Sequence, residues 1–178
     1  MYVVDSQKSW SELASSSLLL KAVSSWRKDP ESWLEGSFER LPETVRVNPL
    51  RTDSKWVEEW ITEQGGKPVP WFKGPGTAWE MPFSRGLAAG KTREMLIALH
   101  ETGRITRQEI VSMIPVLALQ VSAGYYVLDM CASPGSKTTQ ISECLGEDGV
   151  VFANEISNSR ANTLVSNVHR HGSKSAVI

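Results

Sequence analysis

The residues best placed to do chemistry lie in a short turn between an apolar strand, predicted over 125–130, and a helix, predicted over 138–145. This turn reads Cys131-Ala132-Ser133-Pro134-Gly135-Ser136-Lys137. Backbone N–H groups and the helix dipole at a helix start favour a carboxylate or a phosphate. A second apolar strand, predicted over 150–155, ends on Glu155, 20 residues after Gly135. At this spacing an acidic side chain accepts hydrogen bonds from ribose hydroxyls. The pattern therefore indicates a nucleoside-containing ligand.

Two common phosphate-binding loops fit this turn less well. A P-loop with its lysine at Lys137 needs glycines where Cys131 and Ser136 stand, and a dinucleotide fingerprint needs three glycines where only Gly135 is present. The stretch 86–92 (G-L-A-A-G-K-T) is one residue short of a P-loop and has no buried strand before it. We interpret that stretch as a loop entering a helix.

Alternating strands and helices must position the turn. A helix predicted over 157–169 and a third strand beginning at Ala176 follow the second strand, and this order is typical of a parallel sheet. The fold class is therefore α/β, and ligands of such sheets bind beyond the carboxyl ends of the strands.

The chain before the turn predicts a different organisation. A strand over 44–49, a helix N-capped by Asp53 and stopped by Gly65-Gly66, and a strand over 78–81 indicate a small α+β module. Further helices are predicted over 6–27, after Pro30, over 87–100 and over 106–119. We expect three segments, with boundaries at 1–43, 44–86 and 87–178.

Composition excludes several classes of protein. The chain has 178 residues, an apolar fraction of 40% and a net charge of −1, which is typical of a globular protein and gives no strong electrostatic signal for nucleic acid. No apolar run is long enough to span a membrane, and no secretory signal is recognisable at the start. Two cysteines cannot form a disulfide framework, so we expect a cytoplasmic protein, or a nuclear one in a eukaryote. The three histidines have no plausible partner ligands, and no metal site is predicted.

The turn and its surroundings resemble a known family. Residues 127–140 (V-L-D-M-C-A-S-P-G-S-K-T-T-Q) resemble motif I of the Sun/Nop (RsmB-type) RNA cytosine-C5 methyltransferases, whose turn reads D-x-C-A-x-P-G-[GS]-K-T. Residues 46–50 (R-V-N-P-L) resemble the element that opens their RNA-binding N-terminal module, and 107–115 (R-Q-E-I-V-S-M-I-P) the segment leading into motif I. The sequence of residues 108–115 and the P-G-S-K form of the turn resemble most closely the tRNA-modifying branch of the family. The resemblance covers about 44–178.

The resemblance implies the first half of a Rossmann-like methyltransferase sheet, preceded by an α+β RNA-binding module and a helical lead-in. The implied activity is S-adenosylmethionine-dependent methylation of cytosine carbon 5 in RNA, with tRNA as the expected substrate. Residues 44–123 carry a net charge of +2, and we expect their basic side chains, Arg46 and Arg51 among them, to lie on one RNA-binding face. The implied cofactor-binding residues are Cys131, Ala132, Ser133, Pro134, Gly135, Ser136, Lys137, Glu155 and Arg160.

In this family a cysteine thiolate adds to carbon 6 of the base before the methyl group is transferred. The thiol and its helper belong to later motifs, D-x-P-C-S-G and T-C-S, which do not occur in this chain. We therefore expect an N-terminal portion of a longer enzyme, inactive by itself, in which Cys131 is not the nucleophile and no catalytic residue is assigned.

Several residues have a second interpretation. Lys137 stands at a helix start, where a cation is disfavoured by the dipole, so a functional role is favoured over a solvated lysine. Arg160 either contacts the ligand or only lines its site. Trp56 and Trp60, at i and i+4, are interpreted as core residues and not as a stacking platform. The alternative functions are a non-catalytic RNA-binding fragment or pseudo-enzyme and, more remotely, a nucleotide-dependent oxidoreductase.

Overall fold

The structure is a computed structural model that describes residues 17–178, and it divides into two compact units after Leu41. In the first unit, α2 (Leu18–Val23) and α3 (Pro30–Gly36) pack through Leu20 and Leu34. Ser17 caps α2 because its side chain accepts hydrogen bonds from the backbone N–H groups of residues 19 and 20. The first half of the helix expected over 6–27 lies outside the described residues, and within the second half the helix is α2.

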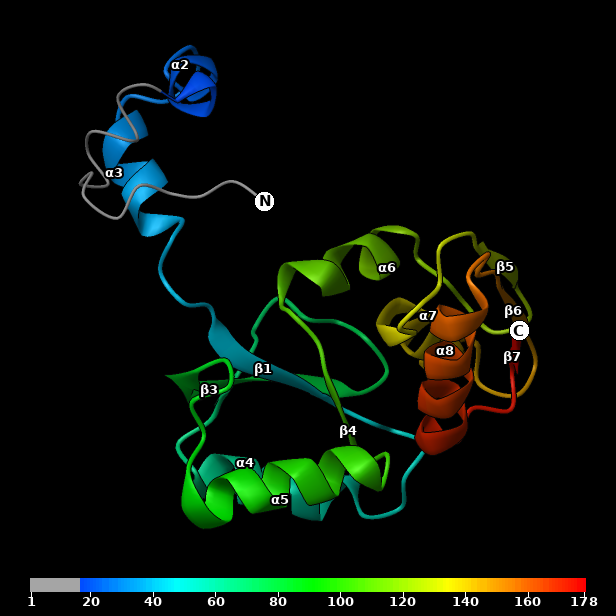
Figure 1. The fold of residues 1–178 in the computed structure, drawn as a ribbon. Coiled ribbons are helices and arrows are strands. Elements are labelled where there is room, and N and C mark those ends of the chain that lie inside the picture. Colours follow the sequence, from blue (N-terminus) through cyan, green and yellow to red (C-terminus); the bar gives the residue numbers. More distant parts are fainter. Residues whose placement is uncertain (1–16) are drawn as a thin grey trace. The chain divides into compact units, whose positions relative to one another are not determined.

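The second unit begins with a four-stranded antiparallel sheet in the order β2-β3-β1-β4 (Figure 1). Its strands are β1 (Pro42–Val47), β2 (Lys67–Pro68), β3 (Thr77–Ser84) and β4 (Ile105–Arg107). The helices α4 (Ser54–Glu63) and α5 (Gly90–Glu101) cover one face of this sheet. The core between them consists of Val45, Val47, Val57, Ile61, Met81, Leu96, Leu99 and Ile105. Thus α5 and β4, whose residues belong to the segment expected over 87–178, complete the core of this sheet.

The prediction of one helix over 106–119 is wrong. The chain there forms β4, then a 3-10 turn, η1 (Val111–Met113), and only then the short helix α6 (Ile114–Ala118). Residues 105–107 pair with β1 because β1 offers them a free edge, and Pro115 fits only the first turn of a helix, where its missing N–H is not needed.

The other face of the first sheet is also covered. Met113 packs there against Val69, Phe72 and Ala78. Consequently, every residue of β1 after Pro42 is buried, and the strand lies between two layers.

The last part of the unit is a parallel sheet in the order β5-β6-β7, formed by β5 (Tyr126–Asp129), β6 (Val150–Ala153) and β7 (Ala176–Val177). The helices α7 (Ser136–Leu145) and α8 (Asn158–His171) connect the strands. The strand–helix alternation expected here is confirmed. Among the described residues, no helix has the length and apolar character needed to cross a bilayer.

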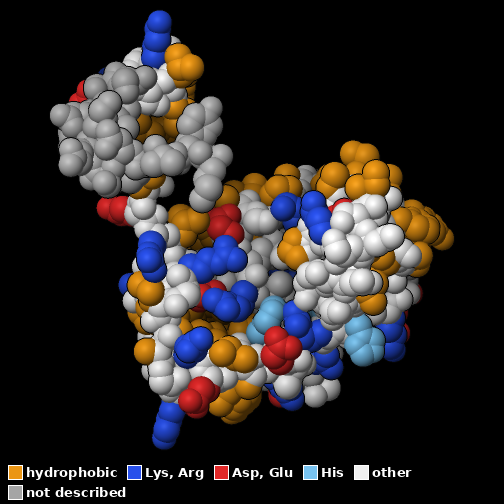
Figure 2. Space-filling model, in the orientation of Figure 1, with side chains coloured by type: hydrophobic (Ala, Val, Ile, Leu, Met, Phe, Trp, Pro, Cys, Tyr) orange, Lys and Arg blue, Asp and Glu red, His pale blue; other side chains and the backbone are white. Residues whose placement is uncertain are grey.

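Both helices of the parallel sheet pack on the same face. Val151 contacts the α7 core and Ala153, two residues further on, contacts the α8 core. The opposite face presents a row of register partners, Leu128, Phe152 and Val177, whose exposed fractions are 61%, 44% and 51%. We call this row the open face; apolar side chains gather on the surface at the β5 end of the molecule (Figure 2).

Candidate functional site

The parallel register brings the turn and Glu155 to the same edge of the sheet. Asp129 at the end of β5 pairs with Ala153 at the end of β6. Cys131 and Glu155 each stand two residues beyond this pair. The carboxyl ends of parallel strands are where ligands of such sheets bind, so the two parts of the predicted nucleoside site lie together.

Two asparagines that the sequence analysis missed hold the turn in place. The backbone N–H of Asn154 donates to the carbonyl of Asp129 (2.8 Å), and its side-chain amide donates to the carbonyl of Met130 (3.0 Å). The amide of Asn167 on α8 donates to the carbonyl of Pro134 (2.6 Å). A polar residue ending an apolar strand was a usable signal for Asn154, whereas Asn167 is recognisable only in three dimensions.

Gly135 is required by the geometry of the turn. Its φ of +105° lies in the left-handed region, and a Cβ there would stand 2.9 Å from Cδ1 of Leu164 on α8. Just before the turn, the carboxylate of Asp129 accepts a hydrogen bond from the hydroxyl of Thr138 (2.7 Å), which braces the turn against α7.

The start of α7 offers donors to an anion. Within residues 17–178 no acceptor is recorded for the backbone N–H groups of Ser136 and Lys137, which open the helix. Cys131, Pro134 and Lys137 are exposed, and the turn lies beside a cavity of about 240 Å³. This cavity is lined by Arg85, Arg107, Gln108, Glu109, Ser112, Asp129, Cys131, Ala132, Ser133, Pro134, Ser136 and Lys137.

Arg160 links Glu155 to the turn. The Glu155 carboxylate accepts from the backbone N–H of Ser157 (3.0 Å) and lies 3.2 Å from the Arg160 guanidinium. That guanidinium also donates to the carbonyl of Ser133 (3.2 Å), whose hydroxyl donates back to the carbonyl of Arg160 (2.9 Å). The Glu155 side chain is only 4% exposed, so a ribose would share or replace these contacts.

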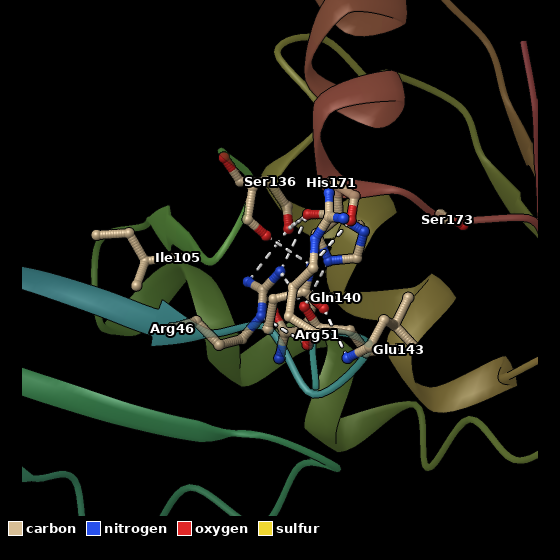
Figure 3. Close-up of polar contacts among 12 residues, drawn as sticks. Arg46, Arg51, Ile105, Ser136, Gln140, Glu143, His171 and Ser173 are labelled. Atoms are coloured by element: carbon tan, nitrogen blue, oxygen red, sulfur yellow. Dashed lines mark hydrogen bonds and ion pairs between the residues drawn. The ribbon is translucent and has the colours of Figure 1, made fainter. Parts of the chain in front are cut away.

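Arg46 is not available to RNA, and the prediction that it lies on an RNA-binding face is wrong. Its side chain is fully buried because α7 places a carboxylate against it: the Arg46 Nε donates to Oε2 of Glu143 at 2.8 Å (Figure 3). The same guanidinium donates to the hydroxyl of Thr139 (3.0 Å), the carbonyl of Ser136 (3.4 Å) and the side chain of Gln108. The guanidinium has five N–H donors, and the acceptors around it satisfy them.

Arg51, the second predicted RNA contact, is half-buried at the C-terminus of α8. Its guanidinium donates to the carbonyl of Arg170 (2.7 Å), and a cation is favoured at a helix C-terminus. The side chain therefore has a structural contact in the chain itself.

The R-V-N element joins the two sheets. Nε2 of His171 donates to the Glu143 carboxylate (2.8 Å), so residues from α7 and α8 meet the guanidinium of Arg46 in one buried network (Figure 3). Asn48 donates from its side-chain amide to the carbonyls of Gly103 and His171, each at 2.8 Å. The strand β1 thus holds both helices of the parallel sheet against the antiparallel sheet.

Neither thiol is prepared for nucleophilic attack. Burial, reinforced by the charge of Glu143, raises the pKa of the Cys144 thiol, so its reactive thiolate is disfavoured. Cys131 is exposed, but it stands in the turn itself. In the described part of the chain no cluster of three His, Cys, Asp or Glu side chains is arranged to hold a metal ion.

The two tryptophans of α4 differ in burial: Trp60 packs against the core of the first sheet, whereas Trp56 is 47% exposed.

Comparison with known proteins is in keeping with this geometry. Residues 116–178 match the family described as 16S rRNA methyltransferase RsmB/F. The tRNA (cytosine(49)-C(5))-methyltransferase of Pyrococcus abyssi is 32% identical over 145 residues, which are 81% of this chain and 44% of that protein. The multisite-specific tRNA:(cytosine-C(5))-methyltransferase of Saccharomyces cerevisiae is 31% identical over 97% of this chain and 30% of its own length. The ribosomal RNA small subunit methyltransferase F of Shewanella piezotolerans is 36% identical over 80% of this chain and 30% of its own length.

Solved structures share the fold. A methyltransferase homologue from Pyrococcus horikoshii superposes with a TM-score of 0.67 at 28% identity, over 85% of this chain and 48% of that one. NSun6 from the same organism, solved with SFG, gives a TM-score of 0.66 at 17% identity, over 89% of this chain and 63% of that one, which supports the fold alone. The expected α/β fold class is confirmed. The chain spans less than half the length of the curated relatives it matches. The resemblance drawn from motif I is also confirmed: residues 116–178 match the RsmB/F methyltransferase family, and the relatives that align with most of the chain are tRNA and ribosomal RNA methyltransferases.

Proposed function

We propose that this chain supplies the cofactor turn for S-adenosylmethionine-dependent methylation of cytosine carbon 5 in RNA, with tRNA as the substrate. The observation that carries the proposal is the turn 131–137, whose free N–H groups at the start of α7 lie at the same sheet edge as Glu155. Relatives that include two tRNA cytosine-C5 methyltransferases support the reaction type.

The residues present suit S-adenosylmethionine. The N–H groups of Ser136 and Lys137 are donors for the carboxylate of an amino acid, and the cationic, exposed Lys137 adds charge on the same side. Glu155 supplies acceptors for ribose hydroxyls, and Arg160 orients its carboxylate. When bound, S-adenosylmethionine supplies the methyl group. The part of this chain is to bind and orient it.

The covalent step belongs to residues outside these 178. A thiolate must add to carbon 6 of the base, and the raised pKa of Cys144 and the position of Cys131 in the cofactor turn suit neither thiol to that step. We therefore propose that the nucleophile is provided by the motifs D-x-P-C-S-G and T-C-S. The proposal assigns no catalytic residue to this chain.

Calorimetry tests the cofactor site. S-adenosylmethionine is titrated into the wild-type chain, Glu155→Ala and a control, Glu147→Ala, whose exposed carboxylate contacts only Lys174 among the described residues. Losing hydrogen bonds to a charged acceptor costs about 1.5–3 kcal/mol, so Glu155→Ala should weaken binding roughly 10- to 100-fold. The control should bind like the wild type. Unchanged binding by Glu155→Ala would remove Glu155 from the site.

Methyl transfer tests the assignment of chemistry. Labelled S-adenosylmethionine is incubated with tRNA and the 178-residue chain, and we expect no transfer. Turnover that is lost in Cys131→Ala would contradict the absence of a nucleophile from this chain. RNA binding without any affinity for S-adenosylmethionine would instead favour the non-catalytic RNA-binding module.

A further inference from the structure

A second cavity, of about 440 Å³, lies behind the cofactor turn. Its lining includes His100, Arg107 and Arg170 from the two sides, and residues 134–136 of the turn between them. It shares Arg85, Arg107, Pro134 and Ser136 with the smaller cavity in front of the turn. Figure 2 shows Lys and Arg side chains gathered around a hollow in the middle of this face, next to a histidine. We call this second cavity the basic cavity.

The lining of the basic cavity is cationic. It contains three arginines and no carboxylate. Two carboxylates lie behind the arginines: Glu43, which is 1% exposed and accepts from Nε of Arg107 at 2.8 Å, and Glu101, which lies 3.3 Å from Arg170. Arg85 is exposed, and its guanidinium has no hydrogen-bond partner recorded among the described residues. Against the effect of burial, the hydrogen bond from Arg107 lowers the pKa of Glu43, and the charge of Arg85 adds to that lowering.

Arg170 is held in place by its neighbours. Its guanidinium donates to Nε2 of His100 (3.0 Å) and to the side chain of Asn167. Burial, and then the charge of Arg170, lower the pKa of His100, so the imidazole is neutral at pH 7 and accepts this hydrogen bond. The neutral imidazole fixes Arg170 without offsetting its charge, and the carboxylate that does offset it, Glu101, is 61% exposed and lies outside the lining of the cavity.

His171 also lines the cavity, but one of its ring nitrogens is closed off from it. Nδ1 of His171 is buried without a hydrogen bond, although Nε2 of the same ring contacts Glu143. Buried polar atoms are normally paired in folded proteins. That nitrogen is closed off from the cavity, so the sign that a ligand is held here is the exposed guanidinium of Arg85, which stands with Arg107 and Arg170 in a lining without carboxylates.

We propose that the basic cavity binds a phosphate of the RNA backbone beside the nucleotide whose base is methylated. This inference rests on the proposed function and deepens it, because it names the part of the substrate that this chain holds. The volume lies within the range of small-ligand pockets, roughly 300–1,000 Å³. Arginine recognises phosphate through paired N–H donors. Because Arg85 and Arg107 line both cavities, successive phosphates of one RNA strand can lie along the surface from the basic cavity to the cofactor turn.

The test uses fluorescence anisotropy of a labelled single-stranded RNA oligonucleotide with the full 178-residue chain over a series of salt concentrations. Arg85→Glu should weaken binding about tenfold or more and lower the slope of log affinity against log salt by about 0.7 for the lost contact. Arg85→Gln removes the donors without adding a negative charge and should act in the same direction. Lys174→Glu, whose side chain is 79% exposed and does not line either cavity, is the matched control and should bind like the wild type.

The outcomes separate this inference from the proposed function. Equal weakening by Arg85→Glu and Lys174→Glu would overturn it, since the effect would then be the net charge alone. Because the cavity is proposed to take a phosphate group, inorganic phosphate should displace the RNA more than chloride of equal ionic strength does; equal displacement by the two salts would overturn the phosphate assignment. Calorimetry with S-adenosylmethionine is run on the same variants: unchanged RNA binding with intact cofactor binding defeats only the inference, whereas a wild-type chain without cofactor affinity defeats the proposed function.

Discussion

Replacing Arg46 with methionine should destabilise the second unit severely. The substitution keeps the length of the side chain but leaves Glu143, whose side chain is 0% exposed, buried opposite an apolar group. Removing one partner of a buried ion pair costs about 3–5 kcal/mol, because the remaining charge has lost its compensation. A natural domain has only about 5–15 kcal/mol of stability in total, so this loss is a large part of it.

Urea unfolding followed by tryptophan fluorescence measures this loss, since Trp60 and Trp79 pack against the core of the first sheet. The double variant Arg46→Met/Glu143→Met is the informative companion. Replacing both members of a buried pair by apolar residues is often neutral, so most of the stability should return. If Arg46→Met changes the free energy of unfolding by less than about 1 kcal/mol while RNA affinity falls, the guanidinium faces solvent and the burial argument is refuted.

Three further predictions concern the turn, a buried histidine and the open face. Gly135→Ala should lower the melting temperature and weaken S-adenosylmethionine binding in calorimetry. An alanine in the left-handed backbone conformation costs roughly 1–2 kcal/mol, and its Cβ would also lie too close to Leu164. An unchanged melting temperature and affinity would show that the turn can adopt another conformation. The stability of the fold should decrease as the pH drops below 6.5, the ordinary pKa of histidine, because the lowered pKa of His100 means that the unfolded state takes up a proton more readily than the folded state. The urea midpoint of His100→Asn should therefore vary less with pH than that of the wild type. If the two midpoints change with pH in the same way, His100 is not the group responsible. Leu128→Lys should reduce self-association in sedimentation without loss of stability, whereas a large drop in the unfolding midpoint would mean that the open face is packed in solution.

Local signals predicted the elements whose formation depends on neighbours in sequence. The helix α4 ends near Gly65-Gly66 as expected, and the turn 131–137 follows β5 and precedes α7 as its residue types require. Asp53 shows the limit of such rules. It stands at the N-cap of α4, but its carboxylate makes no capping bond and accepts instead from Nε of Arg104 (2.6 Å), a hydrogen bond that holds the pKa of Asp53 below its ordinary value.

Long-range partners account for what the sequence did not predict. The residues of β4 follow a helical pattern, yet they pair with β1, some 60 residues earlier. Arg46 has the residue type of an RNA contact, and only the arrival of Glu143, 97 positions later, makes it a buried residue. A single sequence contains no signal for such a pair, because each partner by itself is typical of a protein surface.

The same pair has a consequence for synthesis on the ribosome. Arg46 emerges long before Glu143 and His171, which lies 125 positions after it. At about 5–20 residues per second, roughly 6 to 25 seconds pass before the last member of the network has been translated. During that interval the guanidinium of Arg46 on β1 has no carboxylate partner, so burying the strand between its two layers would leave an unpaired charge. The nascent antiparallel sheet must therefore wait, partly open to solvent, until α7 and α8 are available to close it.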